Sequence, residues 1–423
     1  MHHAARACGI DFGTSNSTVG WLRPGMPALL PLEDGKPTLP SAVFFNADED
    51  TTCFGRVALA EYLEGYEGRL MRALKSLLGS SLIDGHTEVQ GRALGFRDLL
   101  ARFIGELKRR AEAHAGRCFE QAVFGRPVYF VDEDPQADRK AQATLEAVAR
   151  QVGFREVSFQ FEPIGAALHY ESSLEHEELV LIADIGGGTA DFSLVRLSPE
   201  RARRSSGDDD RRADLLGNAG VHVGGTDFDT ALSLASAMPL FGYRSLMKNG
   251  TQVPASIYFQ LATWHTINFA YTREVAATLQ HIYRDAAART ELDRLARLVS
   301  RREGHWLALQ VEAAKIALST AASSPLCLDR IESGLVHTIS ASDFVDATHG
   351  LVDRVAGCVD QLIRQAAIRR DQVDTLYFTG GASGVPQLRA RIAAELPATR
   401  RVEGDLYGSI GAGLALSAAR RYG

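Results

Sequence analysis

Apolar residues recur along the chain in two patterns that predict strands alternating with helices. Short apolar runs typical of buried strands lie at residues 7–12, 122–130, 157–161, 179–184 and 375–379. Elsewhere apolar side chains repeat with the helical period, most clearly at 97–116, 138–152 and 343–368. Strands that alternate with helices in this way predict an α/β fold.

A glycine-containing hairpin follows the first strand in each half of the chain. The first reads Asp11-Phe12-Gly13-Thr14-Ser15-Asn16, and the second reads Asp184-Ile185-Gly186-Gly187-Gly188-Thr189-Ala190-Asp191. Glycine lets a backbone bend so that its N–H groups converge on an anion. An aspartate beside that anion can hold a hydrated divalent cation. Two such loops facing each other would grip the phosphates of a nucleoside triphosphate.

The repeated order of strand, hairpin and strand predicts two lobes of like fold. We expect lobe I at 1–175, with 402–423 crossing back to it, and lobe II at 176–401. Lobe II is expected to include an enlarged, mostly helical tip at about 224–340, whose aromatic residues mainly fill its core. Within that tip, 238–243 is the segment expected to be exposed, and the polar stretch 205–212 is expected to be a surface loop.

The composition and net charge argue against some classes of binding partner. The chain has 423 residues, 45% of them hydrophobic and 23% charged, and its net charge is −6. This gives no electrostatic case for binding nucleic acid or an acidic membrane. The longest apolar runs are far shorter than a bilayer span, and the N-terminus leaves no room for a signal peptide, so we expect a cytoplasmic protein. The cysteines form no Cys-x-x-Cys pair, and Cys8 and Cys327 are expected in the core.

Five motifs in order resemble the ATPase domain of the DnaK-type 70-kDa heat-shock chaperones, in the actin and sugar-kinase superfamily. They are the two hairpins, Phe161-Glu162-Pro163 with Gly165-Ala166-Ala167, Gly224-Gly225-Thr226-Asp227-Phe228-Asp229, and Gly380-Gly381-Ala382-Ser383-Gly384-Val385-Pro386. The compact form resembles the YegD group of chaperone-like proteins. The resemblance implies a two-lobed actin-like fold, made of duplicated ribonuclease-H-like lobes with nucleotide in the cleft between them.

The resemblance also assigns roles at the phosphates. Asp11 and Asp184 would hold Mg²⁺ through its water shell. Lys75 would neutralise charge at the γ-phosphate, and Glu162 and Asp191 would lie near the attacking water. The residues that would bind the phosphates from the two loops are Gly13, Thr14, Ser15, Asn16, Gly186, Gly187, Gly188 and Thr189, with Thr189 also counted as catalytic together with Asp184.

The nucleoside would be held by Gly224, Gly225, Glu312, Lys315, Ser319, Gly380, Gly381, Ser383 and Asp405. The family places adenine between two arginine side chains, whereas this chain has Ile316 and Gly384 at the matching positions. Loss of a stacked guanidinium removes roughly 0.5–2 kcal/mol by analogy with cation–π contacts. We therefore expect triphosphate binding to persist with weaker selection for adenine.

The expected function is a Mg-dependent, slowly hydrolysing, chaperone-like ATPase that lacks the family's peptide-binding half. Its expected cofactors are ATP or ADP and Mg²⁺, and its partners include client or co-chaperone proteins. A small-molecule kinase of the sugar type is one alternative, but it needs a carboxylate base in the cleft, and no aspartate stands in a sugar-kinase-like motif between the two phosphate loops. A nucleotide-dependent switch or scaffold without enzymatic activity is the other.

Overall fold

The computed structural model describes residues 7–131, 134–204 and 211–423, which include little of the predicted surface loop 205–212. The chain divides into two compact units. Unit 1 comprises Met1–Gly220, Cys358–Ser383 and Ala393–Gly423, and unit 2 comprises Val221–Gly357 and Gly384–Ile392. Among the described residues, none of the helices combines the length and the apolar character needed to cross a membrane.

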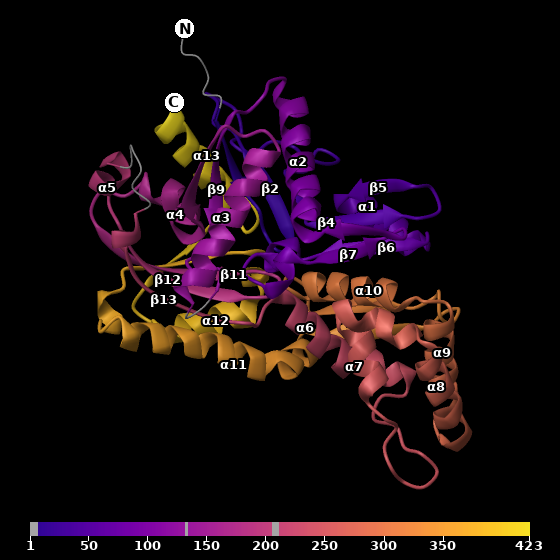
Figure 1. Ribbon diagram of the computed structural model, residues 1–423. Coiled ribbons are helices and arrows are strands. Elements are labelled where there is room, and N and C mark those ends of the chain that lie inside the picture. The colour runs from indigo at the N-terminus through magenta and orange to yellow at the C-terminus, as the bar shows by residue number, and fades with distance from the viewer. Residues whose placement is uncertain (1–6, 132–133, 205–210) are drawn as a thin grey trace. The chain divides into compact units, whose positions relative to one another are not determined.

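Unit 1 contains two five-stranded mixed sheets with the same arrangement of strands (Figure 1). The first, in spatial order, consists of β10 (Glu156–Phe161), β9 (Gln121–Arg126), β1 (Ala7–Asp11), β2 (Asn16–Gly20) and β3 (Thr38–Pro40). The second consists of β17 (Arg400–Glu403), β16 (Thr375–Thr379), β11 (Glu178–Ile185), β12 (Ala190–Leu197) and β13 (Leu215–Val221). In each sheet the central strand pairs antiparallel with the next strand and parallel with a later one.

The first sheet is covered by helices on both faces, as the alternation along β1 dictates. Cys8 and Ile10 point into a core shared with α2 (Phe96–Ala115) and α3 (Pro135–Gln151), which lie next to each other. Ala7 and Val123 of the opposite face pack against α13 (Ser409–Tyr422). Gly9 is required here because a Cβ at this position would lie 2.3 Å from the backbone nitrogen of Ala415 in α13.

The second sheet packs against α4 (Glu162–Glu171), which follows β10 directly. Ile164 and Leu168 of this helix share a core with Val180 and Ile182 of β11. Because α4 begins at Glu162, the strand–helix junction fixes the position of that carboxylate. The same unit contains the short helix α5 (Pro199–Arg204).

A small subdomain interrupts the first sheet between β3 and α2. It comprises β4 (Ala42–Asn46), β5 (Thr51–Phe54), α1 (Gly55–Glu64), β6 (Gly68–Arg72), and the hairpin β7 (His86–Val89) and β8 (Arg92–Gly95). Two 3-10 turns, η1 (Leu74–Leu77) and η2 (Ser81–Asp84), join β6 to β7. Lys75 therefore lies on a tight turn that follows an edge strand.

Unit 2 is mainly helical. Its helices are α6 (Gly225–Leu232), α7 (Ser256–Ala262), α8 (Arg273–Asp285), α9 (Arg289–Ser300) and α10 (Gly304–Leu318), and α11 (Ala341–Gln365) and α12 (Pro386–Glu395) each extend into unit 1. Helices α8 and α9 lie side by side (Figure 1). The unit also contains a two-stranded hairpin, β14 (Ser323–Cys327) with β15 (Val336–Ser340).

Two local expectations are wrong, namely that Cys327 lies in the core and that 238–243 is exposed. The end of the predicted helical segment is the β14–β15 hairpin, and Cys327 is exposed on it because alternate residues of β14 face solvent. The segment 238–243 is not an exposed piece, since Met238 and Phe241 are fully buried. The aromatic residues of this region divide between the core, as with Tyr258, and the surface, as with Phe269.

Candidate functional site

The two hairpin aspartates end the central strands of the two sheets in unit 1. Asp11 is the last residue of β1, and Asp184 is the penultimate residue of β11. Asp11 is buried, and Asp184 keeps partial contact with solvent. Both strands run toward the loops that carry the glycines, so each carboxylate lies beside its own hairpin.

The two hairpin loops meet. A Cβ built on Gly187 would lie 2.2 Å from the Oγ atom of Ser15, so the second loop passes directly over the first. A side chain at Gly187 would require the Ser15 hydroxyl to move. Gly186 closes its own turn by donating its backbone N–H to the carbonyl of Thr189 at 2.9 Å.

Ser41 supports the first loop from outside the hairpin. Its hydroxyl donates to the carbonyl of Gly13 at 2.6 Å, and its backbone N–H donates to the carbonyl of Ser15 at 2.9 Å. The side chain of Thr14 is exposed, and those of Ser15 and Asn16 are half-buried. Sequence reasoning missed Ser41, because the residue lies between Pro40 and Ala42 with no motif to mark it.

Asp184 faces a second carboxylate across its own hairpin. The register of β11 with β12 places Asp191 directly opposite Asp184. Like charges at directly opposed positions of an antiparallel pair are destabilising. Thr189 donates its hydroxyl to the Oδ2 atom of Asp191 at 2.8 Å.

Lys75 and Glu162 form an ion pair from two distant elements. The Nζ atom of Lys75 lies 2.5 Å from the Oε1 atom of Glu162, and both side chains are nearly buried. Ala73, two residues before Lys75, has a φ of 54°, a left-handed conformation that non-glycine residues adopt at a cost of roughly 1–3 kcal/mol. The structure thus brings Lys75 to the first residue of α4.

Electrostatic coupling links these groups into one cluster. Burial, and then repulsion by Glu162, raises the pKa of Asp11 from 3.8 to about 7. Burial, followed by repulsion from Asp191, Glu162 and Asp11, raises the pKa of Asp184 from 3.8 to about 8. Burial alone would lower the pKa of Lys75, but the surrounding carboxylates outweigh it and raise that pKa.

This cluster has more negative than positive charge and fits a cation. Three carboxylates, from Asp11, Glu162 and Asp184, act on the ammonium group of Lys75, and a fourth, from Asp191, acts on Asp184. Among the residues that the structure describes, no group of three or more His, Cys, Asp or Glu side chains is arranged to ligate a metal ion directly. Mg²⁺ keeps most of its water shell and uses one or two carboxylates, so Asp11 and Asp184 suit it.

A glycine turn from β16 closes against Asp184. Gly380 has a φ of 81°, and a Cβ on it would lie 2.5 Å from the Oδ1 atom of Asp184. The buried hydroxyl of Ser383 donates to the carbonyl of Gly380 at 2.7 Å and holds the turn η8 (Gly381–Gly384) in shape. Asp405, which is exposed, lies in the loop between β17 and α13.

The remaining predicted nucleoside residues lie in unit 2. The buried Lys315 of α10 donates to the carbonyl of Gly225 at 3.1 Å and to the Oδ2 atom of Asp229 at 2.9 Å, so it joins α10 to the first turn of α6. Gly224 precedes that turn, and its backbone N–H donates to Asp227 at 2.9 Å. Glu312 and Ser319 are half-buried on and just after α10.

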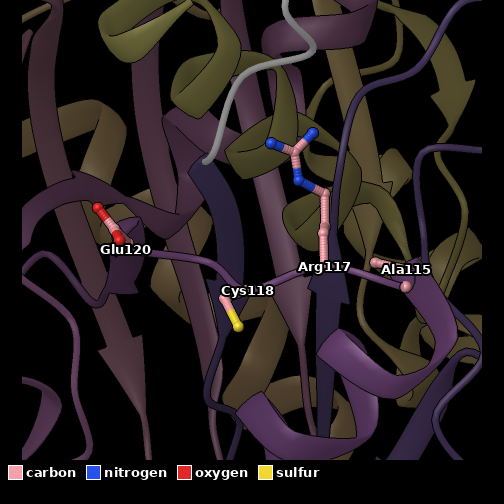
Figure 2. Close-up of a pocket in the computed structure, with 5 residues that line it drawn as sticks. Ala115, Arg117, Cys118 and Glu120 are labelled. Carbon is pink, nitrogen blue, oxygen red and sulfur yellow. The ribbon is translucent and has the colours of Figure 1, made fainter.

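An open pocket of about 430 Å³ lies away from this cluster, at the connection from α2 to β9. Figure 2 shows that its side chains Arg117, Cys118 and Glu120 point in different directions. The pocket lies at the start of β9, whereas the first hairpin loop follows the carboxyl end of β1, which pairs parallel with β9. Ligands of α/β sheets bind at the carboxyl ends of strands. The pocket therefore does not belong to the candidate site.

Comparison with known protein families gives a match over most of the chain. The model of the Hsp70 family, described as Hsp70 protein, matches residues 7–235 and 277–417. The match covers most of the chain, so the protein belongs to the Hsp70 family, has the actin-like ATPase fold, and falls among nucleotide-binding, chaperone-like ATPases. Residues 236–276 of unit 2 stand outside the matched ranges.

Proposed function

We propose that this Hsp70-family chain binds Mg·ATP at its two hairpin loops and hydrolyses it slowly. The observation that carries the proposal is the cluster of Asp11, Asp184, Lys75 and Glu162 beneath two loops that touch at Ser15 and Gly187. The loops supply backbone N–H groups for phosphate oxygens, and the excess of carboxylates calls for a divalent cation.

Asp11 and Asp184 are the residues that hold the magnesium ion in this proposal. When bound, Mg²⁺ would neutralise negative charge on the phosphate oxygens, which is its usual contribution to phosphoryl transfer. The Asp184 carboxylate lies against Gly380, in the turn that follows β16. The backbone of that turn therefore positions this ligand of the cation.

Lys75 is the proposed electrophilic residue, and Glu162 positions it. A buried ammonium held by one carboxylate offers its remaining donors to oxygen atoms that gain negative charge in the transition state. Asp191, which accepts the hydroxyl of Thr189, is the candidate to orient the attacking water. Hydrolysis needs such positioning more than covalent chemistry.

Selection for adenine is proposed to be weak. Ile316, where the resemblance expects an arginine, exposes 56% of its surface on α10, and position 384 has no side chain. We expect GTP to compete with ATP within about tenfold, since a stacked guanidinium contributes roughly 0.5–2 kcal/mol. A strong preference for ATP in competition titrations would show that other residues select the base.

The test compares wild type with Lys75→Met and uses Lys36→Met, an exposed lysine, as the matched control. Mg·ATP at millimolar concentration should raise the thermal midpoint of all three proteins, because ligand binding stabilises the folded state by mass action. Phosphate release should fall by roughly 10²-fold or more in Lys75→Met alone. The absence of any thermal shift in wild type would refute the binding site. A Lys75→Met variant that turns over normally would remove only the catalytic role of the lysine.

We also propose client or co-chaperone proteins as partners, on the basis of family membership alone. A suitable assay is the aggregation of a denatured model protein with and without Mg·ATP. Suppression of aggregation that depends on nucleotide would support this role. Suppression that is absent, or equal in both conditions, would leave an ATPase without chaperone activity toward that substrate.

A further inference from the structure

Tyr407 is a large aromatic residue at the edge of the proposed site that no sequence motif marks. It lies in the loop between β17 and α13 and exposes 53% of its surface. The loop is held by Asp405, whose Oδ1 atom accepts the backbone N–H of Tyr407 at 3.1 Å. The other carboxylate oxygen of Asp405 occupies the space above Gly408, where a Cβ would lie 2.4 Å from it. The backbone beneath the ring is therefore fixed.

The ring of Tyr407 lies on Gly381. A Cβ built on Gly381 would lie 2.7 Å from Cε1 and 3.3 Å from both Cζ and Oη of the tyrosine. These are the three atoms nearest to that position, so the ring occupies space that a side chain at 381 would need. Gly381 is not in the left-handed region, and its missing side chain is explained by this contact.

One peptide unit separates this contact from the Asp184 carboxylate of the proposed site. Gly380, the neighbour of Gly381, lies against the Oδ1 atom of Asp184. Consecutive Cα atoms are about 3.8 Å apart. The Asp184 carboxylate, the Gly380–Gly381 backbone and the Tyr407 ring thus form a continuous line within unit 1. A nucleotide whose phosphates lie beside Asp184 and that extends along this backbone would bring its base to the ring.

We propose that Tyr407 is the aromatic surface on which the base of the bound nucleotide stacks. The proposal rests on the proposed function. Aromatic rings stack on every base and so supply affinity without strong selectivity. That property agrees with a turn whose last residue, Gly384, has no side chain to recognise the base. Stacking on a base would also explain why the ring is half-exposed, which its contact with Gly381 alone does not explain.

The first experiment measures binding of Mg·ATP, Mg·GTP and Mg·tripolyphosphate by calorimetric titration to wild type, Tyr407→Ala and Tyr407→Phe. Loss of a stacked base reduces affinity roughly tenfold or more. Tyr407→Ala should therefore bind both nucleotides about tenfold more weakly and tripolyphosphate equally well, and Tyr407→Phe should match wild type. Equal weakening for all three ligands, or none, would overturn the proposal. If none of the three ligands binds to wild type, the proposed function itself fails.

The second experiment displaces the ring without removing it. In Gly381→Ala the three atoms nearest to the new methyl group belong to Tyr407, so this variant should lose nucleotide affinity as Tyr407→Ala does. The double variant should then lose no more than either single variant, because both act through one contact. Additive losses would overturn the proposal. A fluorescent 2-aminopurine triphosphate should be quenched on binding to wild type and Tyr407→Phe, and much less on binding to Tyr407→Ala.

Discussion

Replacement of Asp184 by asparagine should stabilise the protein in the absence of magnesium and nucleotide, and increasingly so as the pH rises. The folded state holds the pKa of this carboxyl at about 8, compared with 3.8 for an unperturbed aspartate. Between these values the folded state binds a proton that the unfolded chain has lost. Stability from this group is therefore greatest at low pH and falls until the pH passes the folded pKa. Asparagine cannot ionise and removes the dependence.

The magnitude follows from the size of the pKa change. Each pKa unit corresponds to about 1.4 kcal/mol. The stabilisation by Asp184→Asn can therefore grow by at most roughly 3 kcal/mol between about pH 5.5 and pH 8.5. Asp184 keeps partial contact with solvent, which screens its repulsion by Asp191, and we expect roughly 1–2 kcal/mol. The measurement is urea unfolding in EDTA at both pH values, with Asp346→Asn, an exposed aspartate on α11, as the control.

The same variant should lose Mg-dependent binding of ATP, because it removes one of the two proposed ligands of the cation. Stabilisation that is the same at both pH values would refute the reasoning, since it would show that the aspartate is not held protonated by its surroundings. Stabilisation in Asp346→Asn equal to that in Asp184→Asn would refute it as well.

Two further predictions concern glycines. Gly380→Ala places a methyl group 2.5 Å from the Oδ1 atom of Asp184, at a residue whose φ is 81°. Calorimetric titration should therefore show that the affinity for Mg·ATP falls by at least about tenfold. Unchanged affinity would mean that this turn does not position the carboxylate. Gly9→Ala places a methyl group 2.3 Å from the backbone of α13 and should lower the free energy of unfolding by roughly 1–3 kcal/mol, whereas Gly350→Ala, with no atom within 4 Å, should raise it slightly. Equal urea midpoints for these two variants would contradict the packing of α13 on β1.

The sequence predicts the central strands of both sheets well because they are buried on both faces. Strands such as β11 and β16 are then continuous apolar runs, which are easily recognised. The subdomain at 42–95 was missed because its strands are short and its edge strands half-exposed, as in Thr51–Phe54, with polar residues at many positions. The β14–β15 hairpin was missed because its strands are joined by residues 328–335 and not by the two-residue glycine turn that marks a short hairpin.

The candidate site likewise contains some residues that the sequence marks and others that it does not. Asp11 and Asp184 are marked by the glycines and hydroxyl residues that follow them in the chain. The ion pair of Lys75 with Glu162 joins residues that are 87 positions apart and was not predicted, since the family resemblance gave the two residues only separate roles near the phosphates. The opposition of Asp184 and Asp191 depends on the register of β11 and β12, which the spacing of the motif does not fix. Long-range contacts such as that of Ser41 with Gly13 leave no local trace at all.

The two sheets of unit 1 share one topology, and the differences between them explain the charge of the site. Each central strand ends at an aspartate, but the residue opposite Asp11 is Thr18, whereas the residue opposite Asp184 is Asp191. The subdomain inserted after β3 supplies Lys75 to the first sheet, whereas the insertion at the matching place of the second sheet, between β13 and β16, contains Val221–Gly357 of unit 2. One copy thus contributes the cation and the other an additional carboxylate. The excess of carboxylates over cationic groups therefore lies where the two hairpin loops meet. A magnesium ion bound there, together with phosphates, would balance the charge.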